Sequence, residues 1–530
     1  MSVCKFTQLY DEILLNIAYH CSPGDLFALE RTCRTFLEFF SYPMRHFWLF
    51  HLKQLDDFHV PLLSFQPALE ILTSSEIKFI VYQTVKCHRN WNNSLGPRTS
   101  SRKAIDLKNK DLLGRLNSTR AMELSARGYF NAVRTQSDSR STQLELIKIV
   151  AGGHYICLLW SEGYLQVWNT ETRLVVWTYP QLGEFHSSVV IVFDVEFDTI
   201  SENLFFVILE GQRFDSGIFK IIQVDPLNRV SRCIRSNCAI DAQRIRLCRF
   251  CNSGIFVIGE DTFLLSRDLS KMIQLTDLNG ATLRDTTIVD GQIITAMHNG
   301  TSHKIIAIDV EDIIKTRWRR RSRRRREREG EDIGRFQVSI ENDLIAHTSV
   351  MEIDSSGLRS GDMMVLSAYQ PTWRDKQSDS IVYAAMMVKS SDETSFDSLA
   401  VYKLRLKSRA ARMQKVLLGK QPEPPLLVLE QSKLPITLER PHPYSQESPY
   451  HLTTSGQCIL SSVNTRSKSR SMSVVSLEPL LEGDLSVVQL KPISFGRLRV
   501  APGVTSIDKD GGCLAYVDNE EKYLTLQYYN

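Results

Sequence analysis

The sequence predicts a multidomain protein in which a small all-α unit precedes a much larger all-β domain. The chain has 530 residues, which exceeds the usual size of one domain. Apolar residues recur at helical spacing near the N-terminus, whereas beyond residue 143 short β-rich runs separated by turns replace that period. Hydrophobic residues make up 43% of the chain, so it can bury a sizeable core.

Composition narrows the classes of function. The chain has no run of about 18 apolar residues, and Met1 to Leu9 lacks the features of a signal peptide. We therefore expect a soluble protein of the cytoplasm and/or nucleus that does not contact membranes. Eleven scattered cysteines indicate free thiols in a reducing compartment. The net charge of +4 contains a local +7 from residues 317–329, so the remaining chain is mildly acidic and nucleic-acid binding is not expected.

The first fifty residues predict short amphipathic helices. Apolar residues at three- and four-residue spacing predict a helix from Asp11 to Cys21, and Ser22-Pro23 is typical of the start of a second helix. A third segment is rich in aromatic residues, namely Phe39, Phe40, Phe47, Trp48 and Phe50. A unit this small cannot bury so many apolar side chains alone, so we expect it to pack on another domain or a partner.

The same residues resemble a known family, the F-box. The resemblance runs from Phe6 to about Leu55 and is carried by residues 9–17, Ser22-Pro23-Gly24-Asp25-Leu26, Arg31-Thr32-Cys33-Arg34 and Trp48. It implies a three-helix F-box (1–55) that binds a Skp-type adaptor and, through it, the cullin and RING subunits of a ubiquitin ligase. It also implies which residues line or support that contact, namely Leu9, Glu12, Ile13, Leu14, Ile17, Leu26, Leu29, Cys33 and Trp48. The alternative is an unrelated helical bundle whose apolar stripe is core.

A helical connector (56–97) and a polar linker (98–142) are expected next. Thr73-Ser74-Ser75-Glu76 has the pattern of a capping box and predicts a helix to about His88, followed by a loop from Trp91 to Pro97. The linker is rich in Ser, Arg and Asn and should be partly disordered, with one strand-like piece at Ala104 to Leu107.

Residues 143–530 contain seven repeats of an apolar strand, a turn and a second alternating strand, a number typical of a β-propeller. The paired strands are predicted at 153–160 with 164–169, 203–209 with 217–225, 254–259 with 262–268, 291–298 with 303–310, 380–388 with 398–406, 457–463 with 471–477, and 513–517 with 523–529. Residues Gly163 to Asn169, followed by Trp177, resemble a WD repeat with asparagine in place of aspartate.

The last repeat ends in its third strand, so an earlier segment is expected to complete the ring. An unpaired sheet edge would invite aggregation. We predict Lys103 to Lys108 as the closing strand, with Gly128 to Thr135 as the second choice.

Two clusters have alternative interpretations. An Arg-rich loop is predicted at 315–332, and it is either a nuclear-import or acidic-partner patch or a solvated insertion without a dedicated role. Its arginines are Arg319, Arg320, Arg321, Arg323, Arg324, Arg325 and Arg326. Cys233, Cys238, Cys248 and Cys251 could hold zinc, but Cys248 and Cys251 fall in a predicted strand, and no metal or cofactor is expected.

The leading functional hypothesis is a non-catalytic, substrate-recognition subunit of a Skp–cullin–F-box ubiquitin ligase. The F-box would bind the Skp-type adaptor, and loops of the propeller would bind an unknown protein substrate. The sequence has no phosphate-binding loop, zinc-protease motif, nucleophile elbow or dinucleotide fingerprint. The alternatives are a propeller scaffold outside any ligase, or an enzyme such as a hydrolase that uses the F-box as a targeting tag.

Overall fold

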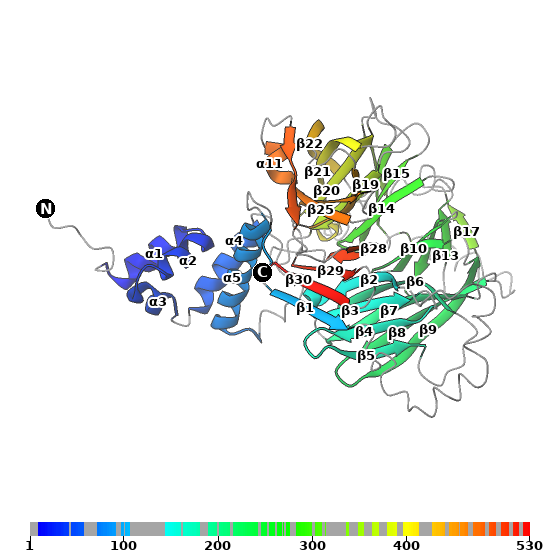
Figure 1. Ribbon diagram of the computed structural model, residues 1–530, viewed down its shortest axis with the longest axis horizontal. Helices are drawn as coiled ribbons and strands as arrows, with labels where there is room; N and C mark the ends of the chain where they lie inside the picture. The colour runs from blue at the N-terminus through cyan, green and yellow to red at the C-terminus, as the bar shows by residue number, and fades with distance from the viewer. Residues whose placement is uncertain are drawn as a thin grey trace.

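The fold is a helical unit beside a ring of β-sheets (Figure 1). The computed structural model describes residues 9–41, 44–57, 71–91, 97–99, 101–106, 144–160, 163–180, 189–198, 201–211, 216–241, 245–251, 254–259, 262–267, 269, 272–275, 282–298, 303–309, 313, 335–338, 348–353, 363–369, 379–389, 396–412, 427–439, 445–454, 456–464, 470–482, 487–493, 500–507, 512–518 and 523–529. The Arg-rich loop at 315–332 and the segment Gly128 to Thr135 lie outside these residues.

Residues 11–57 form four helices rather than the three that were expected: α1 (Asp11–His20), α2 (Pro23–Glu30), α3 (Arg34–Ser41) and α4 (Arg45–Asp57). The predicted start of α2 is confirmed, because the Ser22 hydroxyl accepts a hydrogen bond from the Asp25 N–H at 3.2 Å and Pro23 occupies the first turn. The aromatic segment is divided between α3, which contains Phe39 and Phe40, and α4, which contains Phe47, Trp48 and Phe50.

A fifth helix, α5 (Ser74–Trp91), begins at the predicted capping box. The Thr73 N–H donates to Glu76 Oε2 at 2.7 Å, and the Glu76 N–H donates to Thr73 Oγ1 at 3.3 Å. Hydrogen bonds from the Thr73 hydroxyl and N–H lower the pKa of the Glu76 carboxyl. The helix continues beyond the predicted end near His88, because Trp91 is buried against the β-domain instead of lying in a loop.

Among the described strands, the seven predicted hairpins are the second and third strands of separate sheets. The second strands are β3 (Tyr155–Trp160), β7 (Asn203–Gly211), β11 (Gly254–Gly259), β15 (Gln292–His298), β20 (Ser380–Lys389), β24 (Gln457–Asn464) and β29 (Cys513–Asp518). The third strands are β4 (Leu165–Asn169), β8 (Ser216–Asp225), β12 (Thr262–Ser266), β16 (His303–Asp309), β21 (Phe396–Leu406), β25 (Arg470–Ser476) and β30 (Tyr523–Tyr528). Each predicted strand pair is therefore present among the described residues.

A further strand flanks each side of every hairpin. The first strands are β2 (Leu144–Val150), β6 (Val189–Asp198), β10 (Ile245–Cys251), β14 (Thr282–Val289), β19 (Met363–Tyr369), β23 (Ser445–Leu452) and β28 (Val500–Ile507). The fourth strands are β5 (Leu174–Tyr179), β9 (Val230–Asp241), β13 (Met272–Leu275), β18 (Thr348–Ile353), β22 (Leu427–Glu439), β27 (Lys491–Ile493) and β1 (Ser101–Asp106). Two short strands, β17 (Arg335–Val338) and β26 (Val487–Gln489), extend the third and fifth sheets in parallel.

The sheets form a closed ring, which makes the large domain a β-propeller. Successive first strands contact one another from β2 to β23, and β28 contacts both β25 and β2. Apolar side chains fill the space between neighbouring sheets, as in the clusters of Trp177 with Phe206, of Ile305 with Val382, and of Ile459 with Leu514. Two short helical elements, η4 (Ala151–Gly153) and α11 (Leu477–Glu482), lie in connections.

The predicted closing strand is confirmed. Strand β1 pairs antiparallel with β30, with Ser101 opposite Tyr528 and Asp106 opposite Tyr523, and the two lie side by side in Figure 1. Ile105 is buried in the apolar cluster between the last and first sheets, with Leu524 and Leu526. Part of the region expected to be a linker is therefore the outermost strand of the last sheet.

Polar side chains join the first strands of successive sheets. Lys148 of β2 pairs with Asp194 of β6 at 2.6 Å, and Asp194 also accepts the N–H of Phe250 in β10 at 2.7 Å. In the same way, Asp285 of β14 accepts the N–H of Leu366 in β19 at 2.9 Å. Each carboxylate thereby satisfies a backbone donor of the following sheet, which ties neighbouring sheets together near the centre of the ring.

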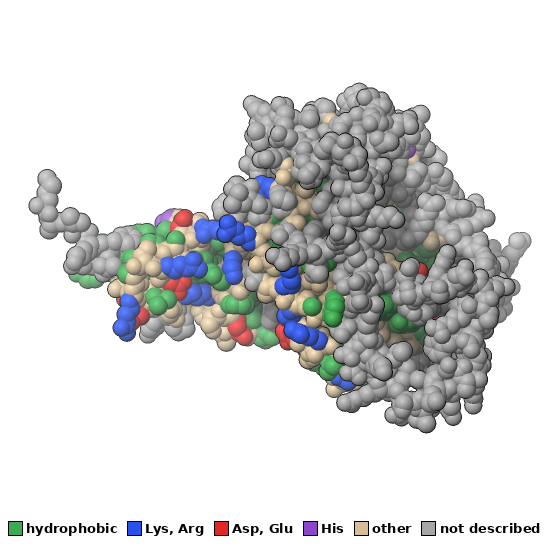
Figure 2. All heavy atoms as spheres, viewed as in Figure 1, with side chains coloured by type: hydrophobic (Ala, Val, Ile, Leu, Met, Phe, Trp, Pro, Cys, Tyr) green, Lys and Arg blue, Asp and Glu red, His purple; other side chains and the backbone are tan. Residues whose placement is uncertain are grey.

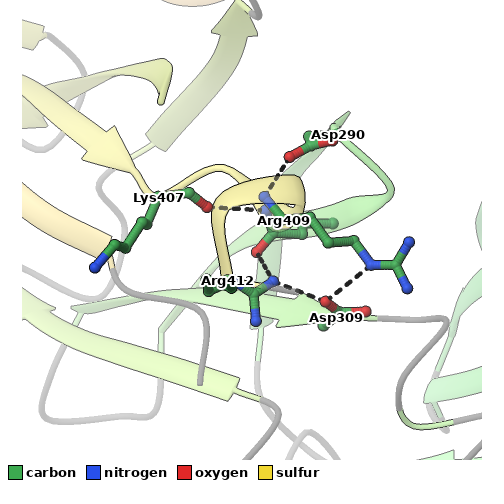
Figure 3. A network of polar contacts seen from close by, with 6 residues as sticks. Asp290, Asp309, Lys407, Arg409 and Arg412 are labelled. Carbon is green, nitrogen blue, oxygen red and sulfur yellow. Dashed lines mark hydrogen bonds and ion pairs between the residues drawn. The ribbon is translucent and has the colours of Figure 1, made fainter. Parts of the chain in front are cut away.

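The fourth and fifth sheets are also joined by a buried ionic network (Figure 3). Arg412 donates from Nη2 to Asp309 Oδ2 at 2.7 Å, and Arg409 donates from Nε to the same oxygen at 3.2 Å. The Arg409 N–H donates to Asp290 Oδ2 at 2.6 Å. Because Asp309 and Arg412 are almost fully buried, the pairing offsets the cost of removing both charges from water.

The WD-like repeat has a physical explanation at its turn. Asn169 Oδ1 accepts the backbone N–H groups of Glu171 and Thr172, both at 2.9 Å. Asp225 closes the matching turn of the second sheet in the same way, through Leu227 and Asn228. Asparagine can replace aspartate here because the turn needs only a side-chain acceptor.

Candidate partner-docking surface

The helical unit, residues 9–91 as far as they are described, has one apolar core supplied by all five helices. Trp48 stacks on Phe27 with ring centroids 5.7 Å apart, and Phe47 meets Trp48 edge to face at 5.0 Å. Leu14 and Leu26 are buried in the same core. Leu14, Leu26 and Trp48, which the resemblance assigned to a contact or its support, therefore support the unit from within.

Two members of the implied contact, Glu12 and Ile13, are exposed on the outward side of α1, and Ile13 is 45% exposed. Tyr10, which the resemblance does not assign to the contact, precedes α1 and is 81% exposed. Leu9 and Ile17 are half-buried beside them. We call Leu9, Tyr10, Glu12, Ile13 and Ile17 the α1 surface. It presents apolar side chains next to a carboxylate, a composition that suits a protein contact.

Two implied contact residues lie elsewhere. Leu29 is half-buried against the core, and Cys33 lines a groove between α2, α3 and α5 to which α1 contributes no residue. Helix α1 packs on α4, whereas α2 packs on α3 and α5. The structure therefore separates Cys33 from the α1 surface.

His51 is a buried polar residue of α4. Its ring meets Phe47 edge to face at 4.5 Å, and Nδ1 lies 3.1 Å from Gln54 Oε1. Burial lowers the pKa of His51, so its neutral form is favoured. This environment gives the histidine a packing role.

Helix α5 attaches the helical unit to the propeller. Its last residue, Trp91, lies with its ring 4.8 Å from that of Tyr529, and Cys87 joins the same apolar cluster. Asn90 Nδ2 donates to the Tyr529 carbonyl at 2.7 Å and to the Arg98 carbonyl at 2.5 Å. This junction lies against the sixth and seventh sheets through Met472 and Leu514. It gives the α1 surface a fixed position relative to the propeller.

The described residues provide no metal centre and no bilayer-spanning helix. Within the described ranges, no three His, Cys, Asp or Glu side chains gather as a metal site would require. Cys248 is buried, and burial raises its pKa to about 12, whereas Cys233 is exposed. The side chains of Cys238 and Cys251 lie outside the described set. Among the described helices, none is both long and apolar enough to cross a membrane.

Comparisons with known proteins show similarity only at the level of solved structures. No protein-family model matches the chain, and no curated protein matches it in sequence. The β-propeller domain of Cps50 (Swd1) from Myceliophteria thermophila is 11% identical, with 73% of this chain and 99% of that chain covered and a TM-score of 0.41. The WD40 domain of SCAP from fission yeast is 9% identical, with 73% and 84% covered and a TM-score of 0.35. Because both scores are low, the propeller assignment rests on the strand pairing of this chain.

Proposed function

We propose that this protein is the substrate-recognition subunit of a Skp–cullin–F-box ubiquitin ligase. In this proposal residues 9–57 are a divergent F-box with one additional helix boundary, and the α1 surface binds the Skp-type adaptor. The seven sheets are the blades of a seven-bladed WD-like propeller that binds the protein substrate. The proposal rests on one observation in α1: Glu12 and Ile13 are exposed, whereas Leu14 beside them is buried in the core of the helical unit.

The attachment of the helical unit supports the same proposal. A receptor subunit performs no chemistry itself and contributes proximity, by holding the substrate near the ubiquitin-loaded enzyme. Proximity requires a defined distance between the two binding sites. The contacts of Asn90 and Trp91 with Tyr529 would maintain that distance, because the propeller cannot rotate about α5 without breaking them. Such a subunit needs no cofactor and would act in the cytoplasm and/or nucleus.

The test is capture of a Skp-type adaptor by the tagged full-length chain in cells. Ile13→Asp should lower the captured amount at least about tenfold, because it places a charge in an apolar contact. Ile13 is well exposed in the free protein, so the core should be unaffected. Leu14→Asp is a poor test, because Leu14 is buried and its replacement would disrupt the unit.

Thr35→Asp provides the matched control, since it adds the same charge at an exposed position of α3. It should leave capture unchanged. Failure of the wild-type chain to retain the adaptor would reject the ligase proposal and favour a propeller scaffold outside any ligase. Equal loss in both variants would indicate general damage and reject the assignment of the contact to the α1 surface.

A further inference from the structure

A groove of about 760 Å³ lies between α2, α3 and α5, on elements that include none of the α1 surface. We call it the α2–α5 groove. Its lining residues are Phe27, Glu30, Arg31, Cys33, Arg34, Leu37, Ser75, Lys78, Phe79 and Tyr82. The groove is open, so a segment of another protein can enter it without displacing any described part of this chain.

The apolar part of the groove is unusually exposed. Phe79 of α5 is 59% exposed and Leu37 of α3 is 49% exposed, and both line the groove. Phe27, which is buried, and Tyr82, which is half-buried, form the inner part, with their rings edge to face at 5.1 Å. Binding of a partner over Leu37 and Phe79 would remove their exposed apolar area from water, which is favourable.

The polar part of the groove is positively charged. Its lining contains Arg31, Arg34 and Lys78 but only one carboxylate, Glu30, which pairs with Lys78 at 2.5 Å. Arg31 donates to the Tyr82 hydroxyl at 3.1 Å, and no described carboxylate lies within ion-pair distance of it. Arg34 pairs with Glu38 at 2.6 Å, but both are largely exposed, so this pair contributes little stability.

Further cations continue along α5 from the groove. Lys86 lies over the Tyr82 ring at 5.9 Å, and Arg89 packs across Gly24 at the start of α2. Figure 2 shows Lys and Arg side chains distributed among apolar ones on the visible face of the helical unit. The acidic residues Asp11 and Glu12 are at the start of α1 instead. Among the residues that line the groove, cations therefore outnumber carboxylates by three to one.

We propose that the α2–α5 groove is a second docking site, for an acidic amphipathic helix of a partner protein. The apolar face of that helix would cover Leu37 and Phe79, and its carboxylates would pair with Arg31 and Arg34. Guanidinium groups form paired hydrogen bonds with carboxylates, which gives the charge match a geometric preference. Helices dock in apolar grooves through side chains at three- and four-residue spacing. The inference goes beyond the proposed adaptor contact at the α1 surface, because no residue of that surface lines the groove.

The experiment measures fluorescence anisotropy of labelled synthetic peptides mixed with the full-length protein. One peptide is an amphipathic helix with leucines on one face and glutamates on the other, and its control has lysine in place of every glutamate. The glutamate peptide should bind at least about tenfold more tightly, because charged hydrogen bonds form only with it. The difference in affinity between the two peptides should decrease as the salt concentration rises, because salt screens the charge pairs. Equal binding of the two peptides would overturn the proposal.

Variants locate the binding within the groove. Phe79→Ser should weaken binding of the glutamate peptide about tenfold, because it removes apolar contact area. The helical unit should stay folded, since Phe79 is exposed. Arg31→Glu with Arg34→Glu should reverse the preference toward the lysine peptide. Lys53→Glu with Arg235→Glu is the control, because it makes the same charge change at exposed positions outside the groove. A preference that survives reversal at Arg31 and Arg34 would refute the assignment.

Two further measurements separate this site from other occupants. The molar mass of the protein in solution should be that of a monomer and the same for wild type and Phe79→Ser. A dimer that Phe79→Ser dissociates would show that a second copy covers the groove and would overturn the proposal. Capture of a Skp-type adaptor should be unaffected by the groove variants. Its loss would make the groove part of the adaptor contact and would equally overturn the inference of a second site.

Discussion

Replacement of Trp91 by alanine should weaken the attachment of the helical unit to the propeller. Trp91 is 1% exposed and packs on Tyr529. An aromatic side chain of this size buries about 150–250 Å². At about 25 cal/mol per Å², that area is worth about 4–6 kcal/mol. The measured cost of removing a buried tryptophan, about 3–5 kcal/mol, is consistent with this value.

The loss should fall on the junction, because Trp91 belongs to the apolar cluster that joins α5 to the sixth and seventh sheets and not to the core of the helical unit. We expect Trp91→Ala to unfold at a lower temperature than wild type, with the helical unit melting before the propeller. Solution X-ray scattering should show a larger radius of gyration, since the two parts would no longer be held together. Trp91→Phe, which keeps an aromatic ring against Tyr529, should lower the melting temperature much less than Trp91→Ala.

The result that would refute this reasoning is a Trp91→Ala protein with unchanged melting and unchanged scattering. The junction would then contribute little, and the fixed position of the α1 surface would need another cause. Unfolding of the whole chain in one step at a lower temperature would also contradict the expectation, because it would mean that the propeller depends on the helical unit.

Two other predictions concern the ring. Ile105→Asp should destabilise the propeller by about 2–5 kcal/mol in chemical denaturation, because it buries a charge in the closing strand. Arg102→Ala, at an exposed position of the same strand, should change the free energy of unfolding little. Burial alone would raise the pKa of Asp194, but Lys148, Arg249 and a hydrogen bond from the Phe250 N–H lower it below its ordinary value of 3.8. The ionised form of Asp194 therefore stabilises the fold above about pH 4, and this stability is lost as pH falls through the folded-state pKa. Asp194→Asn should reduce the dependence of unfolding free energy on pH in the acid range. An unchanged slope of unfolding free energy against pH would contradict this prediction.

Local signals in the sequence were sufficient where the physical cause is local. Ser22 caps its helix within three residues, and the Thr73–Glu76 box is closed by its own side chains, so both helix starts could be predicted. The hairpins could be predicted because a short apolar strand is followed, after a turn, by a second alternating strand. The closing strand could also be predicted, because Ala104 to Leu107 is a short strand-like piece within an otherwise polar stretch.

Features that depend on distant partners could not be predicted. Trp91 continues a helix because Tyr529, at the other end of the chain, packs against it. Asp194 and Asp285 bind backbone groups of the next sheet, and no local pattern marks such an acceptor. In the helical unit the apolar spacing identified α1 but did not tell buried Leu14 from exposed Ile13, because that depends on where α4 packs.

The most direct test of the central claim is the affinity of the purified full-length protein for a purified Skp-type adaptor, measured by calorimetry. The proposal predicts saturable binding with one adaptor per chain, and a loss of at least about tenfold in affinity for Ile13→Asp but not for Thr35→Asp. Absence of binding by the wild-type protein, or equal affinity of wild type and Ile13→Asp, would contradict the claim that the α1 surface docks a ligase adaptor.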